Sequence, residues 1–389
     1  MNSLNETQLF DWLSIGIFML TALFMVGNNN VNQMFLWGAV PIMFIHYFFS
    51  FINNGLSLNI YEKRLLLLFI WITLTTIVSV DYNASFTELK LCWGAYAMIF
   101  IIMNIQSKGN TLYFIFFIYV LYMIDLLHYA QNNFITIDIT SERADDISVN
   151  ANLFGYILFF FNVSIYFIGD CKQKAISTIF KILHFSVVPL SFYLGLITAS
   201  RQIMSINIPL FLLLTCIRYK LNKLRNLFIV IAIIGGGIIY FGDSIMELYD
   251  SSLLKKRMEL DVKDDARYAL VINAIQVGVE NPLMGVGPGC FAIVNHGMSH
   301  NNFLELFANS GLFALIIYIN LMYIFLKRQY LRYRASKDTK YLAFFVFGVT
   351  YAFYNNFYVF YRSPWLILFF MIVASYSEQY YKDRSKELA

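Results

Sequence analysis

The chain has 389 residues, of which 59% are hydrophobic and 13% charged. Soluble domains carry about 25% charged residues, so this composition excludes an ordinary soluble enzyme, and an aromatic content of 18% excludes a disordered chain. The net charge of +4 is small and gives no indication of a nucleic-acid partner. The four cysteines have neither disulfide nor zinc spacing.

Apolar segments of membrane-spanning length recur along the whole chain and predict about twelve helices. In chain order they are 9–27, 31–51, 65–80, 89–105, 111–130, 151–169, 177–199, 203–217, 226–242, 303–326, 341–361 and 364–381. The first is expected to be retained, because it lacks the basic start of a signal peptide and has Glu6 and Asp11 near its beginning. The sequence therefore predicts an all-α integral membrane protein, with residues 1–389 forming a single polytopic domain.

The basic residues predict the orientation of these helices. Most of the 28 Lys and Arg residues fall in alternate loops, which by the positive-inside rule face the cytoplasm together with both termini. The outer side then carries two longer segments, a small loop at 131–150 and a large extracytoplasmic loop at 243–302, between the ninth and tenth spans. Chemistry that needs a shaped aqueous surface is expected on this outer side. No ATP-binding G-x-x-x-x-G-K-[ST] loop occurs in the sequence.

One charged residue, Arg201, interrupts the apolar segment 186–217. The segment is too long for one span, so we expect a hairpin that turns near residues 198–202 and holds Arg201 at the outer interface. An ionisable residue in a membrane costs about 2.5–3.5 kcal/mol at the midplane and by default indicates a function. The alternative is an arginine that reaches lipid phosphates.

The large outer loop contains a predicted helix over 264–280. Arg267 falls in its first turn, where the helix dipole disfavours a cation, so it needs either an acidic neighbour or an anionic ligand. Pro282 ends the helix, and three nearby glycines permit tight backbone turns. The glycine pattern fits neither phosphate-binding fingerprint, so a structural turn is expected.

His300 lies at the start of the tenth span, where a histidine can act as a general base or as a hydrogen-bond donor to phosphate or sugar. Glu305 follows one turn later and would orient His300 or bind sugar. His296 and His300 have the spacing of two metal ligands on a helix, but no third ligand is in register and no metal is predicted. A hydrogen-bonded interfacial histidine is the alternative.

Two further arginines belong to the outer side. Arg143 either pairs with Asp145 or Asp146 or binds a ligand, and Arg362 lies at the outer end of the eleventh span, where interface anchoring is the alternative. Because arginine binds phosphate with two parallel hydrogen bonds, several arginines with a histidine on one side of the membrane would suit a lipid-linked pyrophosphate.

Taken in order, four motifs resemble the superfamily of O-antigen polymerases (Wzy-type) and O-antigen ligases (WaaL-type). They are Arg143 ahead of Asn-Ala-Asn-Leu-Phe-Gly at 150–155, the pair Ser200 and Arg201, the Arg267 helix with the loop Glu-Asn-Pro-Leu-Met-Gly-Val-Gly-Pro-Gly-Cys-Phe at 280–291, and His-Asn-Asn-Phe-Leu-Glu at 300–305 followed by Gly311. The resemblance covers residues 143–325 closely.

The resemblance implies a GT-C-like helical bundle and a metal-independent glycosyltransferase without a cofactor, acting on the outer face of the bacterial cytoplasmic membrane. The implied partners are an undecaprenyl-pyrophosphate-linked oligosaccharide, membrane lipid and a chain-length regulator protein. Arg201 and Arg267 would hold the diphosphate, and His300 would position or activate the acceptor. The remaining residues expected to bind substrate are Arg143, Glu305, Asn301 and Arg362.

The family contains polymerases, which extend one lipid-linked repeat unit with another, and ligases, which transfer the finished glycan to lipid A-core. The form of residues 299–306 and the acidic character of 131–150 favour a polymerase. The rival from another class is a polysaccharide flippase. The sequence shows no two-half repeat of the kind from which transporters are usually built.

Overall fold

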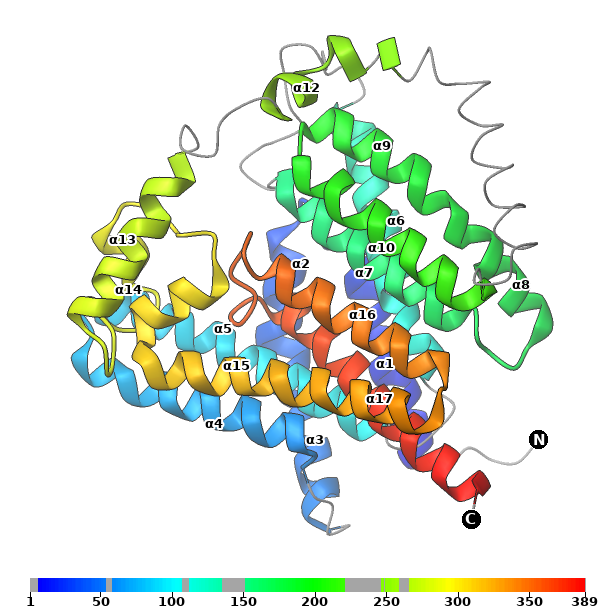
Figure 1. The fold of residues 1–389 in the computed structure, drawn as a ribbon. Helices are drawn as coiled ribbons and strands as arrows, with labels where there is room; N and C mark the ends of the chain where they lie inside the picture. The colour runs from blue at the N-terminus through cyan, green and yellow to red at the C-terminus, as the bar shows by residue number, and fades with distance from the viewer. Residues whose placement is uncertain are drawn as a thin grey trace. The chain divides into compact units, whose positions relative to one another are not determined.

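The structure is a computed structural model, which describes residues 6–53, 58–106, 112–134, 151–220, 246–247, 249–258 and 266–388. Every element in these ranges is helical (Figure 1). The chain divides into two compact units, which are described separately below: unit 1 is Met1–Phe35 with Leu112–Leu260, and unit 2 is Leu36–Thr111 with Asp261–Ala389.

Unit 1 is arranged around one central helix, α7, which contacts α6, α8, α9 and α10. Its side chains are buried from Phe154 to Ile168, as expected for the middle helix of a bundle. A short 3₁₀ turn at His184–Ser186 joins α8 to α9. The helices of unit 1 are α1 (Glu6–Phe24), α2 (Asn29–Met34), α6 (Leu112–Phe134), α7 (Ala151–Ile168), α8 (Lys174–Leu183), α9 (Val187–Thr198), α10 (Arg201–Tyr219) and α12 (Leu253–Met258).

Unit 2 is built around the long helix α15, which packs against α4, α13 and α16, while α5 packs against α3 and α17 (Figure 1). Short turns of non-α helix occur at Phe35–Ala39 and Thr76–Val78. The α-helices of unit 2 are α3 (Val40–Asn53), α4 (Ile60–Thr75), α5 (Tyr82–Gln106), α13 (Ala266–Glu280), α14 (Cys290–Val294), α15 (Asn302–Ser336), α16 (Thr339–Tyr354) and α17 (Pro364–Leu388).

Helices occupy eleven of the twelve predicted spans; the span predicted at 226–242 lies outside the described residues, as does 135–150 of the small outer loop. Within the described ranges, 6 helical stretches could cross a membrane by length and composition. They are Asn29–Asn53, Tyr82–Gln106, Tyr113–Asn133, Lys174–Thr198, Arg201–Tyr219 and Asn302–Ser336. The described residues thus form a helical protein with several membrane-spanning candidates, and the count of about twelve stays a prediction.

The predicted hairpin around Arg201 is confirmed. Helix α9 ends at Thr198 because Ala199 adopts a left-handed conformation, with φ 48°. Ser200 is extended, and Arg201 is the first residue of α10. The helices pack closely because Gly195 leaves room for Met204, whose Cγ would lie 2.9 Å from a β-carbon at position 195.

Helix α15 is interrupted at Gly311, whose φ of 76° and ψ of −176° are not helical. The interruption frees carbonyl groups that an uninterrupted helix would use internally. Other segments of unit 2 satisfy them: Val286 N–H donates to Ala308 O, Gly287 N–H to Asn309 O and Trp71 Nε1–H to Ser310 O, each at 2.9 Å.

The loop between α13 and α14 therefore supplies hydrogen-bond partners to the backbone of α15 at the break. Leu312 N–H donates to Pro282 O at 2.8 Å on the far side of the break. A β-carbon at Gly311 would overlap the Leu283 carbonyl, and one at Gly285 would overlap the backbone at Asn309. The glycines thus allow two backbones to approach closely, and the structural turn expected from the sequence is confirmed.

Candidate functional site

In unit 1, Arg201 lies half-buried at the start of α10, between the buried residues Ser200 and Gln202. Gln202 Nε2–H donates to Asn152 Oδ1 at 2.7 Å. A β-carbon at Gly155 would lie 3.1 Å from Ile203 Cγ1, so the starts of α7 and α10 are in close contact. Residues 152–155 of the first motif and the Ser200–Arg201 pair, far apart in sequence, thus meet in one place.

Arg143 and Arg267 are two further arginines predicted to bind the lipid-linked substrate. Arg143 lies outside the described residues. Arg267 occupies the first turn of α13, where the exposed N–H groups of a helix end create a favourable place for an anion. The predicted position of Arg267 at the start of a helix is therefore confirmed.

In unit 2, a short turn holds His300 at the start of α15. Ser299 donates its N–H and its hydroxyl to Glu305 Oε2 at 2.7 and 2.6 Å. Asn301 caps the helix, because its Oδ1 accepts hydrogen bonds from the N–H groups of Phe303 and Leu304. His300 itself is half-buried between these two anchored residues and has a left-handed backbone with φ 54°.

His296 and His300, which have the sequence spacing of two metal ligands on a helix, do not lie on a helix in the structure. Both residues have positive φ angles, 52° and 54°, and lie in turns, so their spacing does not place them on one face of a helix. Among the described residues, no group of three His, Cys, Asp or Glu is placed to hold a metal ion.

Arg362 is part of a buried ion pair. Its Nη1 lies 2.8 Å from Glu88 Oε2, and the two side chains are only 14% and 3% exposed. Its Nη2 donates to Met298 Sδ at 2.7 Å. Burial alone would lower the pKa of Arg362, but the Glu88 carboxylate raises it above the ordinary value for arginine. The guanidinium is thus charged and enclosed, rather than an anchor at the membrane interface.

Asn302 connects the Arg362 segment to the His300 turn. Its Oδ1 accepts hydrogen bonds from Phe360 N–H at 2.5 Å and Tyr361 N–H at 2.9 Å, while its own N–H donates to Asn355 O at 2.7 Å. We call Glu88, Ser299, His300, Glu305 and Arg362 the polar cluster of unit 2. Its members come from α5, α15 and the two turns beside α15 and α17. Direct contacts join Ser299 to Glu305 and Glu88 to Arg362, and Asn302 ties the Arg362 segment to the turn that carries His300.

The polar cluster offers hydrogen-bond acceptors as well as the imidazole. Glu88 and Glu305 each have one oxygen, Oε1, that is buried without a hydrogen-bond partner among the described residues. A buried carboxylate oxygen in this state accepts a hydrogen bond from water or from a sugar hydroxyl. The cluster therefore suits an uncharged, hydroxyl-rich ligand better than a free anion, because Glu88 already neutralises Arg362.

Glu88 and Asn302 were not expected as site residues. Glu88 directly precedes the predicted span 89–105, and Arg362 lies two residues before the span 364–381. Two isolated opposite charges at the same predicted face of a membrane protein are a signal for pairing. Asn302 has no comparable signal, because its partners are backbone N–H groups of a distant loop.

The elements of the described residues are all helical, and several of these helices are long and apolar enough to cross a membrane. Residues 185–319 match a family model described as O-Antigen ligase. The match includes the α9–α10 hairpin, α13, the glycine loop and the His300 turn. It confirms the resemblance of this part of the chain to the O-antigen polymerase and ligase superfamily. No curated protein matches the chain.

Proposed function

We propose that the protein is a bacterial polysaccharide polymerase, for O-antigen or capsule, which joins oligosaccharide repeat units carried on undecaprenyl pyrophosphate at the outer face of the cytoplasmic membrane. The observation that carries this proposal is the family match over residues 185–319. That segment contains all three residues assigned to catalysis, Arg201, Arg267 and His300.

The proposed reaction is a direct displacement. A hydroxyl oxygen of the acceptor glycan attacks the anomeric carbon of the donor and forms the glycosidic bond as the bond to the diphosphate breaks. The diphosphate leaves with the electron pair and is bound by Arg201 and Arg267, with Arg143 assisting. The hydroxyl proton passes to the imidazole of His300. The arginines supply the positive charge, so the proposed reaction uses no metal or cofactor.

The remaining residues act by holding the acceptor in place. Glu305 and Asn301 support the backbone on both sides of His300, and we propose that they set the direction of the imidazole. We propose that Arg362 and Glu88, which belong to the same polar cluster, contact sugar hydroxyls. A chain-length regulator protein is the expected partner of such a polymerase.

A ligase is the second candidate, because the matching family model is described as O-Antigen ligase. The bond formed and the bond broken are of the same kind. Only the acceptor differs, being lipid A-core instead of a second lipid-linked repeat. The form of residues 299–306 is the reason for preferring the polymerase.

The test is glycan analysis in a strain of the source organism that lacks the protein, complemented with wild type, Arg201→Ala or the exposed control Arg334→Ala. If the protein is a polymerase, deletion and Arg201→Ala should leave single repeat units on lipid A-core, while the control should restore long chains. Polymer that accumulates on the lipid carrier without attachment would make the protein a ligase. Repeat units trapped on the cytoplasmic side would contradict both and support a flippase.

A further inference from the structure

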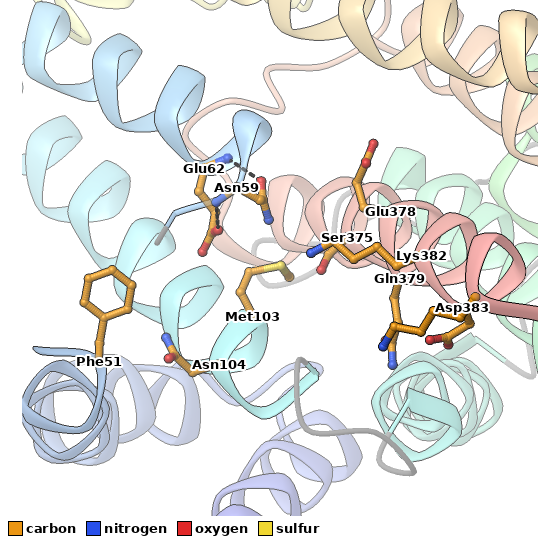
Figure 2. Close-up of a pocket in the computed structure, with 11 residues that line it drawn as sticks. Phe51, Asn59, Glu62, Met103, Asn104, Ser375, Glu378, Gln379, Lys382 and Asp383 are labelled. Atoms are coloured by element: carbon orange, nitrogen blue, oxygen red, sulfur yellow. Dashed lines mark hydrogen bonds between the residues drawn. The ribbon is translucent and has the colours of Figure 1, made fainter. Parts of the chain in front are cut away.

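Unit 2 contains a second polar site, remote from the polar cluster. It is a pocket of about 280 Å³ formed by α3, α4, α5 and α17 (Figure 2). Helix α5 contributes Glu88 to the polar cluster and Asn104 to the pocket; 16 residues of helix between them correspond to about 24 Å. The two sites therefore lie toward opposite ends of α5.

One side of the pocket is acidic. Glu62 is only 6% exposed, and its Oε2 accepts a hydrogen bond from Asn59 N–H at 2.7 Å. No cation pairs with Glu62 among the described residues. Glu62 precedes the predicted span 65–80, and burial raises the pKa of its carboxyl to about 7. Gln379 lines the pocket from α17, across from Glu62, and has an Oε1 that is buried without a hydrogen-bond partner in the described part of the chain.

The other side is basic. Lys382 and Lys386 are exposed residues four apart on α17, so they lie on one face of the helix. Neither forms an ion pair within the described ranges. Asp383 also lines the pocket rim. Glu378 contributes little free charge, because Arg328 and Arg332 bind its two oxygens at 3.0 and 2.7 Å; Figure 2 shows its carboxylate directed away from Glu62.

An apolar edge completes the pocket. Phe51 and Met103 line it beside the polar groups. Phe51 belongs to α3, whose neighbouring side chains Ile45, Phe48 and Ile52 are 43–56% exposed. In a membrane protein such a helix face contacts acyl chains. The pocket thus combines an unpaired buried acid, two free cations and access to a lipid-facing surface.

We propose that this pocket binds the phosphoethanolamine headgroup of a membrane phospholipid. The ammonium group donates hydrogen bonds to Glu62 and Gln379, the phosphate binds Lys382 and Lys386, and the acyl chains lie along α3. A pocket of about 280 Å³ has room for a small polar group and not only for a single water or ion. An anionic headgroup without an amine would leave Glu62 unpaired, and a choline headgroup has no N–H to donate.

The test is native mass spectrometry of the full chain, delipidated in detergent and then exposed to equimolar phosphatidylethanolamine, phosphatidylglycerol and phosphatidylcholine with the same acyl chains. Wild type should retain phosphatidylethanolamine over each competitor by about tenfold, the effect of one charge-assisted hydrogen bond. Glu62→Gln should abolish the preference over phosphatidylcholine; glutamine preserves the capping box of α4, so folding should survive. Lys382→Gln with Lys386→Gln should weaken retention of all three lipids.

The control is Lys327→Gln, an exposed cation of α15 that does not line the pocket, and it should retain lipid as wild type does. Gln379→Leu provides a second variant that should reduce the preference in the same direction. Equal retention of the three lipids, a preference for phosphatidylglycerol, or an unchanged preference in Glu62→Gln would overturn the proposal. Soluble glycerophosphoethanolamine that binds while the phospholipid does not would overturn the assignment to a lipid.

Discussion

Glu88 and Arg362 are the residues on which the geometry of the polar cluster most depends. Each is enclosed, and each neutralises the other at 2.8 Å. Removing one partner of a buried pair leaves an uncompensated charge and costs about 3–5 kcal/mol, whereas replacing both with uncharged groups costs much less. The pair is therefore expected to matter more for the position of the loop before α17 than for net stability.

This gives the first prediction. Arg362→Gln should lower the unfolding free energy by about 3 kcal/mol or more, and Glu88→Gln with Arg362→Gln should recover part of the loss. Thermal unfolding of the purified protein in detergent measures both. Lys90→Gln, an exposed charge on the same helix, is the control and should change little. Additive losses in the double variant would show that the two side chains do not interact.

The second prediction concerns pH. Burial raises the pKa of Glu62 from 4.5 to about 7 in the folded protein. The fold thus favours the protonated acid, so its stabilisation is complete below the unfolded pKa and is lost as the pH rises through about 7. In delipidated protein, stability should fall between pH 5 and 8 by on the order of 2 kcal/mol. Glu62→Gln should flatten this dependence, and an equal slope in both proteins would disprove the assignment.

At the residue scale, sequence reasoning located the candidates on the turns that position them: Arg201 at a hairpin, Arg267 in a first helical turn and His300 at a helix start. It did not reveal that Glu305 binds Ser299 or that Arg362 is enclosed by Glu88. Those contacts depend on which helices pack together, and composition and spacing carry no information on that pairing.

At the scale of elements, the shape of α15 depends on another segment of the chain. Four hydrogen bonds join the break at Gly311 to the loop after α13 and to Trp71; three are donated to α15, and Leu312 N–H donates the fourth to Pro282 O. A kinked helix in a membrane persists only where neighbouring groups satisfy the freed backbone. The loop therefore supplies the hydrogen-bond partners that α15 lacks at the break. These bonds fix the direction of the first turns of α15, which carry Glu305.

The third prediction tests this element. Gly311→Ala adds a β-carbon that overlaps the Leu283 carbonyl at a backbone angle that favours glycine, so it should cost at least about 2 kcal/mol of stability. Gly16→Ala is the matched control, because nothing lies within 4 Å of the added carbon. Comparison of the two unfolding midpoints measures the effect. Equal midpoints would show that the loop and α15 are not tightly joined.

The sequence predicts elements that depend on neighbouring residues along the chain. It does not predict features that depend on contacts with residues far away in the sequence. The α9–α10 hairpin follows from an apolar segment too long for one span, and α13 ends before Pro282 as expected. The break at Gly311 appeared in the sequence only as a lone glycine within an apolar run. Its physical cause is a set of backbone hydrogen bonds from residues 282–287, which no helical periodicity could indicate.

At the scale of the whole molecule, the distribution of basic residues predicts that both termini face the cytoplasm and that the loop at 243–302 faces outward. This orientation is the fourth prediction. A reporter enzyme that works only in the cytoplasm should be active when fused to the C-terminus, and one that works only outside the membrane should be inactive there. A cysteine introduced at Asp250 should react with a membrane-impermeant reagent added from outside. Labelling of Asp250→Cys only after the membrane is opened would reverse the orientation and with it the proposed side of the reaction.

The central claim is that the protein transfers a glycan from a lipid-linked diphosphate and that Arg201 binds the leaving group. The most direct measurement is reconstitution of the purified protein with lipid-linked glycans extracted from a strain that lacks it, following glycan length and released undecaprenyl pyrophosphate together. Wild type should lengthen the glycan and release one carrier per bond formed, without added metal, while Arg201→Ala and Arg201→Lys remain folded and lose activity by at least about a hundredfold. Full activity in both variants, or lengthening without carrier release, would contradict the account.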